Sequence, residues 1–186
     1  LISSFNNRIM FIDPTTLELA GEITTGIDIG GPANGNVDHI QHAFADEGAL
    51  LLLPSNRTRE IYAFDMTRFP IGNDSRVQSF SPNNVTVPVA VAVNVSGTQA
   101  AISDFDGNRV RIVELQEQFP PYSTPLANIS TVDFLHPPES ALSGFGPRGL
   151  HYINDQLLVV HGEIGQLRNF QFRFDPRQSR FEWMFD

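Results

Sequence analysis

One pattern recurs four times along this chain of 186 residues, and it restricts the possible folds more than any other feature. Each copy is a run of β-branched or aromatic residues that ends in a carboxylate. The copies cover residues 8–13, 60–65, 109–114 and 170–175, so their starts lie 52, 49 and 61 residues apart. A period of this size is typical of proteins built from repeated supersecondary units.

Each copy is flanked by other short apolar runs. One precedes each copy (1–5, 49–53, 99–103, 156–160), a further one precedes three of these (39–45, 88–95, 149–153), and one follows each copy (17–23, 76–80, 129–135, 180–185). The connections are rich in Gly, Asn and Asp, which tolerate the positive φ of tight hairpins. Since no twelve-residue segment shows a helical period, the sequence predicts an all-β chain.

Four antiparallel strands repeated at about 50 residues are typical of a β-propeller blade. We label the strands of a blade a to d from the central channel outward. The sequence predicts one partial propeller over residues 1–186: an incomplete blade without strand a at 1–25, then complete blades at 36–82, 85–136 and 144–186. A two-sheet sandwich is an alternative, but it does not require the same order of hairpins three times.

The strand count amounts to about three and three-quarter blades, whereas closed rings have about four to eight. We therefore expect a fragment of a six- to seven-bladed propeller, whose remaining blades are its first partner. In that case the open faces belong to residues 1–25 and to the last blade, including Phe170, Phe172, Phe174 and Trp183.

Composition excludes several classes of chemistry. The net charge of -9 and pI near 4.9 argue against a nucleic-acid partner, and no apolar run is long enough to span a membrane. The chain has no Cys, which excludes disulfides and thiolate metal sites. All 12 basic residues are Arg. The absence of Lys excludes chemistry that forms a Schiff base with a lysine side chain. We expect no cofactor and no metal; the Asp104–Asn108 segment has the composition of a hairpin turn rather than of a calcium loop.

Five Asn-X-Ser/Thr sequons are more than this composition gives by chance. They predict a secreted, extracellular glycoprotein with N-glycosylation on exposed turns or strand ends. The acceptors are Asn56, Asn73, Asn84, Asn94 and Asn128.

Two stretches resemble a known family. Residues 144–152 (Gly-Phe-Gly-Pro-Arg-Gly-Leu-His-Tyr) and 157–163 (Leu-Leu-Val-Val-His-Gly-Glu) are similar to a blade start in the seven-bladed lactonase/carboxymuconate-cyclase-like propellers. In that family a Gly-Pro-Arg-His segment opens strand a and Asn-Glu ends strand b; Gly149 and Gly162 replace the His and the Asn here. Residues 88–115 and 8–26 resemble the wider class of surface-layer and NHL-like propeller repeats.

Ligands of propellers usually sit where the b–c and d–a connections meet at one end of the channel. His39, Asn56, Arg57, Asp104, Asp106 and His161 are predicted at this end. Opening a lactone needs a base for water and a cation or donor for the carbonyl oxygen. His151 or Glu163 is the candidate base, Arg148 the candidate carboxylate-binding cation, and His42 a candidate from a neighbouring blade. A structural role for each of these side chains is the alternative.

The resemblance implies a lactonase-like protein that, if it is an enzyme, acts as a hydrolase or isomerase on a small lactone or carboxylate without a metal. The other hypothesis is a non-catalytic extracellular propeller that binds a protein or glycan, or that packs into an assembly. Fold does not decide between the two hypotheses.

Overall fold

The computed structural model confirms an all-β chain. It describes residues 2–4, 8–24, 41–68, 76–81, 85–107, 109–115, 131–135, 146–162, 168–175 and 180–183, with side chains at 9–23, 41–68, 79–81, 85–107, 109–115 and 146–160. The only helical segment in this part of the chain is η1 (Asp46–Gly48), a single 3-10 turn. No helix among these residues is long and apolar enough to cross a membrane.

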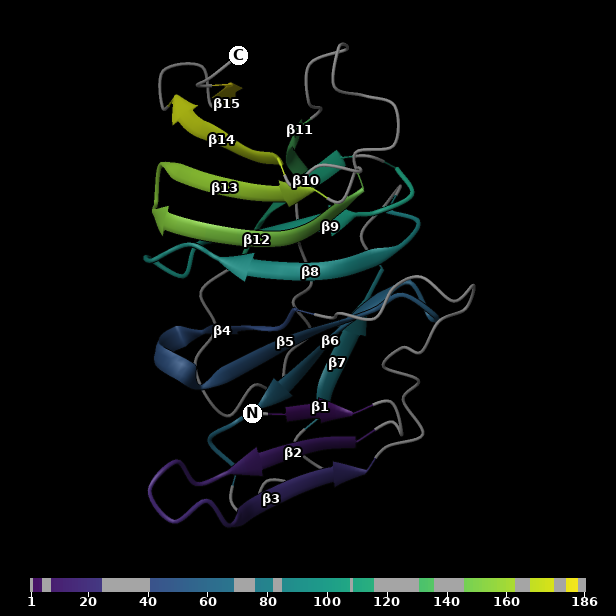
Figure 1. Ribbon diagram of the computed structural model, residues 1–186, viewed down its shortest axis with the longest axis vertical. Coiled ribbons are helices and arrows are strands. Elements are labelled where there is room, and N and C mark those ends of the chain that lie inside the picture. The colour runs from purple at the N-terminus through teal and green to yellow at the C-terminus, as the bar shows by residue number, and fades with distance from the viewer. Residues whose placement is uncertain are drawn as a thin grey trace.

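Four antiparallel sheets follow one another along the long axis of the molecule (Figure 1). The first has three strands, β1 (Ile2–Ser4), β2 (Arg8–Ile12) and β3 (Leu19–Thr24). The other three have four strands each, in consecutive order: β4 (Ala43–Ala45), β5 (Leu50–Ser55), β6 (Glu60–Asp65) and β7 (Arg76–Phe80); β8 (Pro88–Val93), β9 (Gln99–Asp104), β10 (Arg109–Glu114) and β11 (Thr131–Leu135); β12 (Pro147–Asn154), β13 (Leu157–Gly162), β14 (Arg168–Asp175) and β15 (Arg180–Trp183). The arrangement confirms the predicted partial propeller.

Two strands are shorter than their apolar runs. The 39–45 run yields only β4, and ahead of β4 the backbone of Gln41 forms a single parallel bridge with Ala90. The 17–23 run begins as a strand only at Leu19, because Leu17 has φ 61 and its amide donates to the Asp13 carbonyl at 2.8 Å. Turn closure thus overrides apolar character at the start of β3.

The core explains the run of four leucines in β5. Side chains alternate across a strand, so a central strand between two packed sheets is apolar on both faces. Leu50 and Leu52 pack in the cluster shared with the third sheet, and Leu51 and Leu53 in the cluster shared with the first sheet. Ile9 and Ile23 of the first sheet belong to the second of these clusters.

The first sheet buries one face and exposes apolar residues beside its turn. Leu17 and Leu19, beside the β2–β3 turn, are 76% and 55% exposed, whereas Ile9 and Ile23 are buried against the second sheet. The side chains of Phe170, Phe172, Phe174 and Trp183 lie outside the described residues.

Candidate functional site

The strand order gives the molecule two ends. One end carries the turns after β5 (55–60) and after β9 (104–109), together with the starts of β8 and β12; we call it the b–c end. The opposite end carries the turns after β4, β8 and β12 and those after β2 and β6. In Figure 1 the b–c end is on the right, since β8 and β12 both run from right to left.

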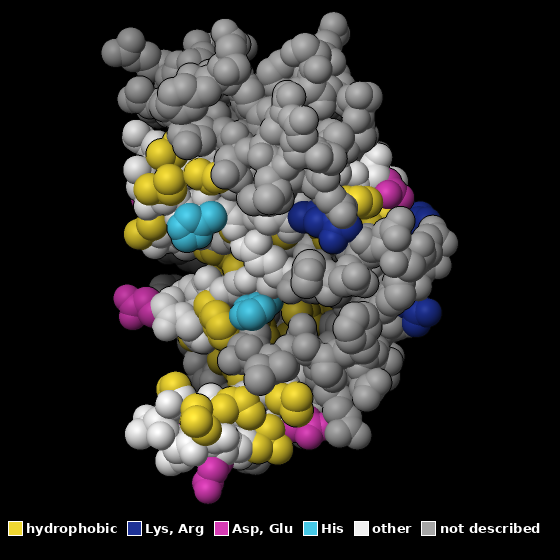
Figure 2. All heavy atoms as spheres, in the orientation of Figure 1, with side chains coloured by type: hydrophobic (Ala, Val, Ile, Leu, Met, Phe, Trp, Pro, Cys, Tyr) yellow, Lys and Arg dark blue, Asp and Glu magenta, His cyan; other side chains and the backbone are white. Residues whose placement is uncertain are grey.

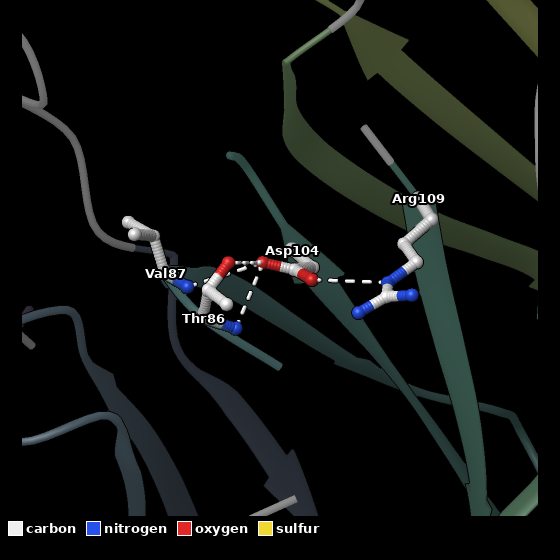
Figure 3. A network of polar contacts seen from close by, with 4 residues as sticks. All are labelled: Thr86, Val87, Asp104 and Arg109. Atoms are coloured by element: carbon white, nitrogen blue, oxygen red, sulfur yellow. Dashed lines mark hydrogen bonds and ion pairs between the residues drawn. The ribbon is translucent and has the colours of Figure 1, made fainter. Parts of the chain in front are cut away.

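Asp104 organises the b–c end. This fully buried carboxylate closes β9 and contacts the segment that leads into β8 (Figure 3). Its Oδ1 accepts hydrogen bonds from Thr86 N (3.0 Å), Thr86 Oγ1 (2.7 Å) and Val87 N (3.1 Å), and its Oδ2 pairs with Arg109 Nε at 3.1 Å. Burial raises the pKa of Asp104, but these donors outweigh burial and hold the pKa below its ordinary value. Asp104 therefore stays ionised, and its hydrogen bonds connect a b–c turn to a d–a connection.

The turn after Asp104 depends on space at Gly107. A Cβ at this position would lie 2.0 Å from Asp104 Oδ2 and 3.0 Å from Arg109 Nε. Gly48 (φ 95) and Gly97 (φ 72) do have the positive φ that the sequence predicts for hairpin glycines, but Gly107 does not. Its small size is what the Asp104–Arg109 pair requires.

Phe105 and Arg148 link the third sheet to the fourth at the same end. The guanidinium carbon of Arg148 lies 5.2 Å from the centre of the Phe105 ring, within the range of a cation–π contact. The ring also packs on Gly146, where an added Cβ would come within 2.6 Å of Phe105 Cε2. Gly146 and Arg148 belong to the Gly-Pro-Arg segment, so this segment has a packing role here.

Gln41 connects the inner strands of three sheets. Its backbone amide donates to the Val89 carbonyl and its carbonyl accepts from Val91 N, both at 3.0 Å. Its side chain reaches β12, where Nε2 donates to the Leu150 carbonyl and Oε1 accepts from Leu150 N at 3.0 Å. Nothing in the sequence pattern predicts this role of Gln41, because it is a polar residue within the 39–45 run and its partner is 109 positions away.

Two of the histidines in the predicted site have described side chains. His42, just ahead of β4, packs edge-on against Phe44, with ring centres 5.7 Å apart, and burial lowers its pKa. His151 is exposed on β12. Figure 2 shows the histidine side chains at two separate places on one face.

The remaining site predictions divide between turns and undescribed segments. Arg57 and Asp106 are exposed on b–c turns, as predicted. Glu163 and His39 lie outside the described residues, and so does the side chain of His161. Within the described residues, no group of three or more His, Cys, Asp or Glu could hold a metal ion.

Two of the five sequon asparagines are described, and both are buried. Asn94 is 5% exposed; its Nδ2 donates to Ser96 Oγ (3.0 Å) and Thr98 Oγ1 (3.1 Å), and its Oδ1 accepts from Gln99 N (2.9 Å). Asn56 is 8% exposed. The Asn94 sequon thus has a structural role in the β8–β9 turn. Asn73, Asn84 and Asn128 lie outside the described residues.

The repeated terminal carboxylates also have a local role in the two copies whose turns are described. Asp13 Oδ1 accepts from the amides of Thr15 and Thr16, and Asp65 Oδ1 accepts from Thr67 N. Such carboxylates close the turn that follows the third strand of a sheet. The pattern that revealed the repeat therefore marks turns and not chemistry.

Comparison with known proteins supports the fold and no closer relationship. No protein-family model and no curated protein matches the sequence. Among solved structures, the chain is similar to the RRP9 WD40 repeats with a TM-score of 0.62 at 11% identity, covering 98% of this chain and 46% of that one.

Two further structures give the same result. A 6-phosphogluconolactonase-like protein from Bacteroides uniformis has a TM-score of 0.58 at 11% identity, covering 77% of this chain and 39% of its own. The β-propeller domain of Cps50 (Swd1) from Myceliophteria thermophila has a TM-score of 0.55 at 6% identity, and the match covers 78% of this chain and 40% of that domain. The chain thus has a propeller fold and spans less than half the length of each of these structures.

Proposed function

We propose that this chain is part of a β-propeller that recognises a protein partner through its b–c end. The observation that carries the proposal is the way this end is fixed: Asp104 ties a b–c turn to the connection before β8, and Phe105 meets Gly146 and Arg148 at the start of β12. A surface ordered in advance loses little entropy on binding.

The placement of the histidines favours recognition over catalysis. A hydrolytic site needs its base and its cation around one reacting atom. The His42 ring packs against Phe44, and His151 is exposed on β12. WD40 repeats and lactonase-like proteins both share this fold, so the fold is compatible with either role.

Site-specific cross-linking tests the proposal. A photoreactive benzoyl-phenylalanine replaces exposed Asp106 at the b–c end, and Glu18 at the opposite end in the matched control. After irradiation in the native extract, we expect one discrete protein adduct from position 106 and none from position 18. Equal adducts from both positions, or none from position 106, would overturn the proposal.

Lactone ring opening is the second candidate function, and the position of Arg148 favours it. Its guanidinium stands at the channel end on an aromatic ring, where it would bind a substrate carboxylate while His151 or Glu163 activates water. Proton NMR of a six-membered sugar lactone with the protein would show accelerated ring opening, reduced about a hundredfold in Arg148→Gln. Hydrolysis at the buffer rate would exclude this lactone class.

We also propose, on the sequons alone, that the protein is secreted and glycosylated at one or more of Asn73, Asn84 and Asn128. Expression in a eukaryotic secretory host followed by glycan-releasing amidase treatment and peptide mass mapping tests this. No mass shift at any of the three positions would contradict it.

A further inference from the structure

The charges of this acidic protein are distributed unevenly between its two ends. Among the arginines whose side chains are described, Arg68 lies at the opposite end, and the others lie at or just inside the b–c end: Arg57, Arg59, Arg109, Arg111 and Arg148. Most described acids lie at the opposite end: Asp13, Glu18, Asp46, Glu47, Asp65, Glu114 and Asp155. Glu22 lies two residues inside the b–c end of β3, as Arg111 does in β10. Figure 2 shows the arginine side chains in view on the right, the side where β8 and β12 begin. Among the described side chains, arginine thus gathers at the b–c end of a chain whose net charge is -9.

Four described acids lie at or just inside the b–c end, and hydrogen bonds hold two of them within the fold. Asp104 is buried in the network described above, and Glu60 accepts hydrogen bonds from Tyr62 Oη (2.8 Å) and Ser79 Oγ (3.1 Å). Asp106 is the exposed acid among them. Among the described side chains of this end, the exposed charges are therefore two arginines, Arg57 and Arg59, and one acid, Asp106.

Two arginines of this end have unusual surroundings. Arg59 is exposed and has φ 62, in the left-handed region that favours glycine. Arg111 is buried on β10 two residues after Arg109; burial and the neighbouring Arg109 charge both lower the pKa of Arg111.

We propose that the b–c end binds an acidic segment of its protein partner, a short stretch rich in Asp and Glu; this proposal rests on the function proposed above. The planar guanidinium fork accepts a carboxylate in two parallel hydrogen bonds, which suits a chain whose 12 basic residues are all Arg. The acidic opposite end and the net charge of -9 disfavour a long polyanion such as RNA.

The test measures the fluorescence anisotropy of a labelled decapeptide of alternating Glu and Gly, titrated with the full chain. The same peptide with Gln in place of Glu, and a labelled ten-nucleotide uridine strand, serve as comparison ligands. We expect the acidic peptide to bind at least tenfold more tightly than either, and its affinity to fall as salt rises.

Matched variants locate the site. Arg57→Gln with Arg59→Gln should weaken acidic-peptide binding about tenfold, whereas Arg68→Gln, which removes one charge at the opposite end, should leave it unchanged. Arg59→Gly should weaken binding while raising the melting temperature, because glycine relieves the positive φ; a folding defect would lower both.

The outcomes separate this inference from the proposed function. Equal binding of the acidic and Gln peptides, tighter binding of the uridine strand, or equal losses in the Arg57/Arg59 and Arg68 variants would overturn the acidic-segment inference. Recognition at the b–c end would still stand if the position-106 adduct forms. Loss of that adduct together with retained peptide binding would instead overturn the proposed function.

Discussion

At the residue scale, Gly107 shows how one missing methyl group permits an ion pair. Replacing it with Ala would place Cβ 2.0 Å from Asp104 Oδ2, so the carboxylate or Arg109 must move. We expect Gly107→Ala to lower the free energy of unfolding by about 2–3 kcal/mol, the cost of disturbing a buried charge-assisted bond. Urea denaturation measures this.

The control for Gly107 is Gly97→Ala. Gly97 has φ 72 and its added Cβ would meet nothing closer than 3.9 Å, so only the backbone cost of about 1 kcal/mol applies. In an Arg109→Gln background, the effect of Gly107→Ala should shrink, because the pair it disturbs is already broken. Full additivity would contradict this account.

The Asn94 side chain gives a second prediction at this scale. It bonds Ser96, Thr98 and Gln99 across the β8–β9 turn. Asn94→Ala should lower the free energy of unfolding by about 1–3 kcal/mol, because the half-buried Gln99 amide loses its acceptor. Asn94→Asp keeps the acceptor and should cost less.

Peptide mapping of secreted protein should find no glycan on Asn94; an occupied Asn94 in folded protein would contradict the structural role.

At the element scale, Gln41 makes the inner strands depend on one another. Its side chain exchanges two hydrogen bonds with Leu150 while its backbone is bonded to Val89 and Val91. Gln41→Leu should speed hydrogen exchange at the Leu150 amide and lower stability by about 1–2 kcal/mol. Gln41→Glu keeps an acceptor for that amide and should preserve its protection. Unchanged exchange in Gln41→Leu would show that β12 needs no such tie.

Strands were predictable from the sequence to the extent that burial decides them. The four leucines of β5 face two cores, so their apolar run is continuous and easily detected. Contacts between sheets were not predictable in this way. Gln41–Leu150 joins residues 109 positions apart, and Arg148–Phe105 depends on a glycine at 146, which a local pattern does not show.

The candidate site was predictable only as a location. Propeller topology places the b–c turns at one end, and Arg57, Asp104, Asp106 and Arg148 are found there. The edge-on contact of His42 with Phe44 was not predictable, because the pattern of apolar runs does not show which rings meet. The net charge likewise did not show that the described arginines gather at the b–c end, since a sum over residues contains no spatial information.

At the scale of the whole molecule, the ionised Asp104 links stability to pH. Its folded pKa is lower than the ordinary value of 3.8 that applies in the unfolded chain. A lowered folded pKa stabilises the folded state fully above the unfolded pKa, and this contribution is lost as pH falls from about 5 through 3.8 toward the folded value. Asp104 thereby contributes to acid-induced unfolding.

The comparison of wild type with Asp104→Asn isolates this contribution from that of the other carboxylates. The amide keeps an acceptor for Thr86 and Val87 but turns a donor toward Arg109 Nε, so we expect a deficit of about 2–3 kcal/mol at pH 7. The deficit should shrink as pH falls below about 4, where the wild-type carboxyl begins to protonate.

Asp13→Asn is the control, because Asp13 also has a lowered pKa but lies on an exposed turn with local partners. Thermal melts of the three proteins from pH 7 to pH 3 measure both effects. A deficit for Asp104→Asn that stays constant over this range would mean that Asp104 fastens the b–c end without its charge.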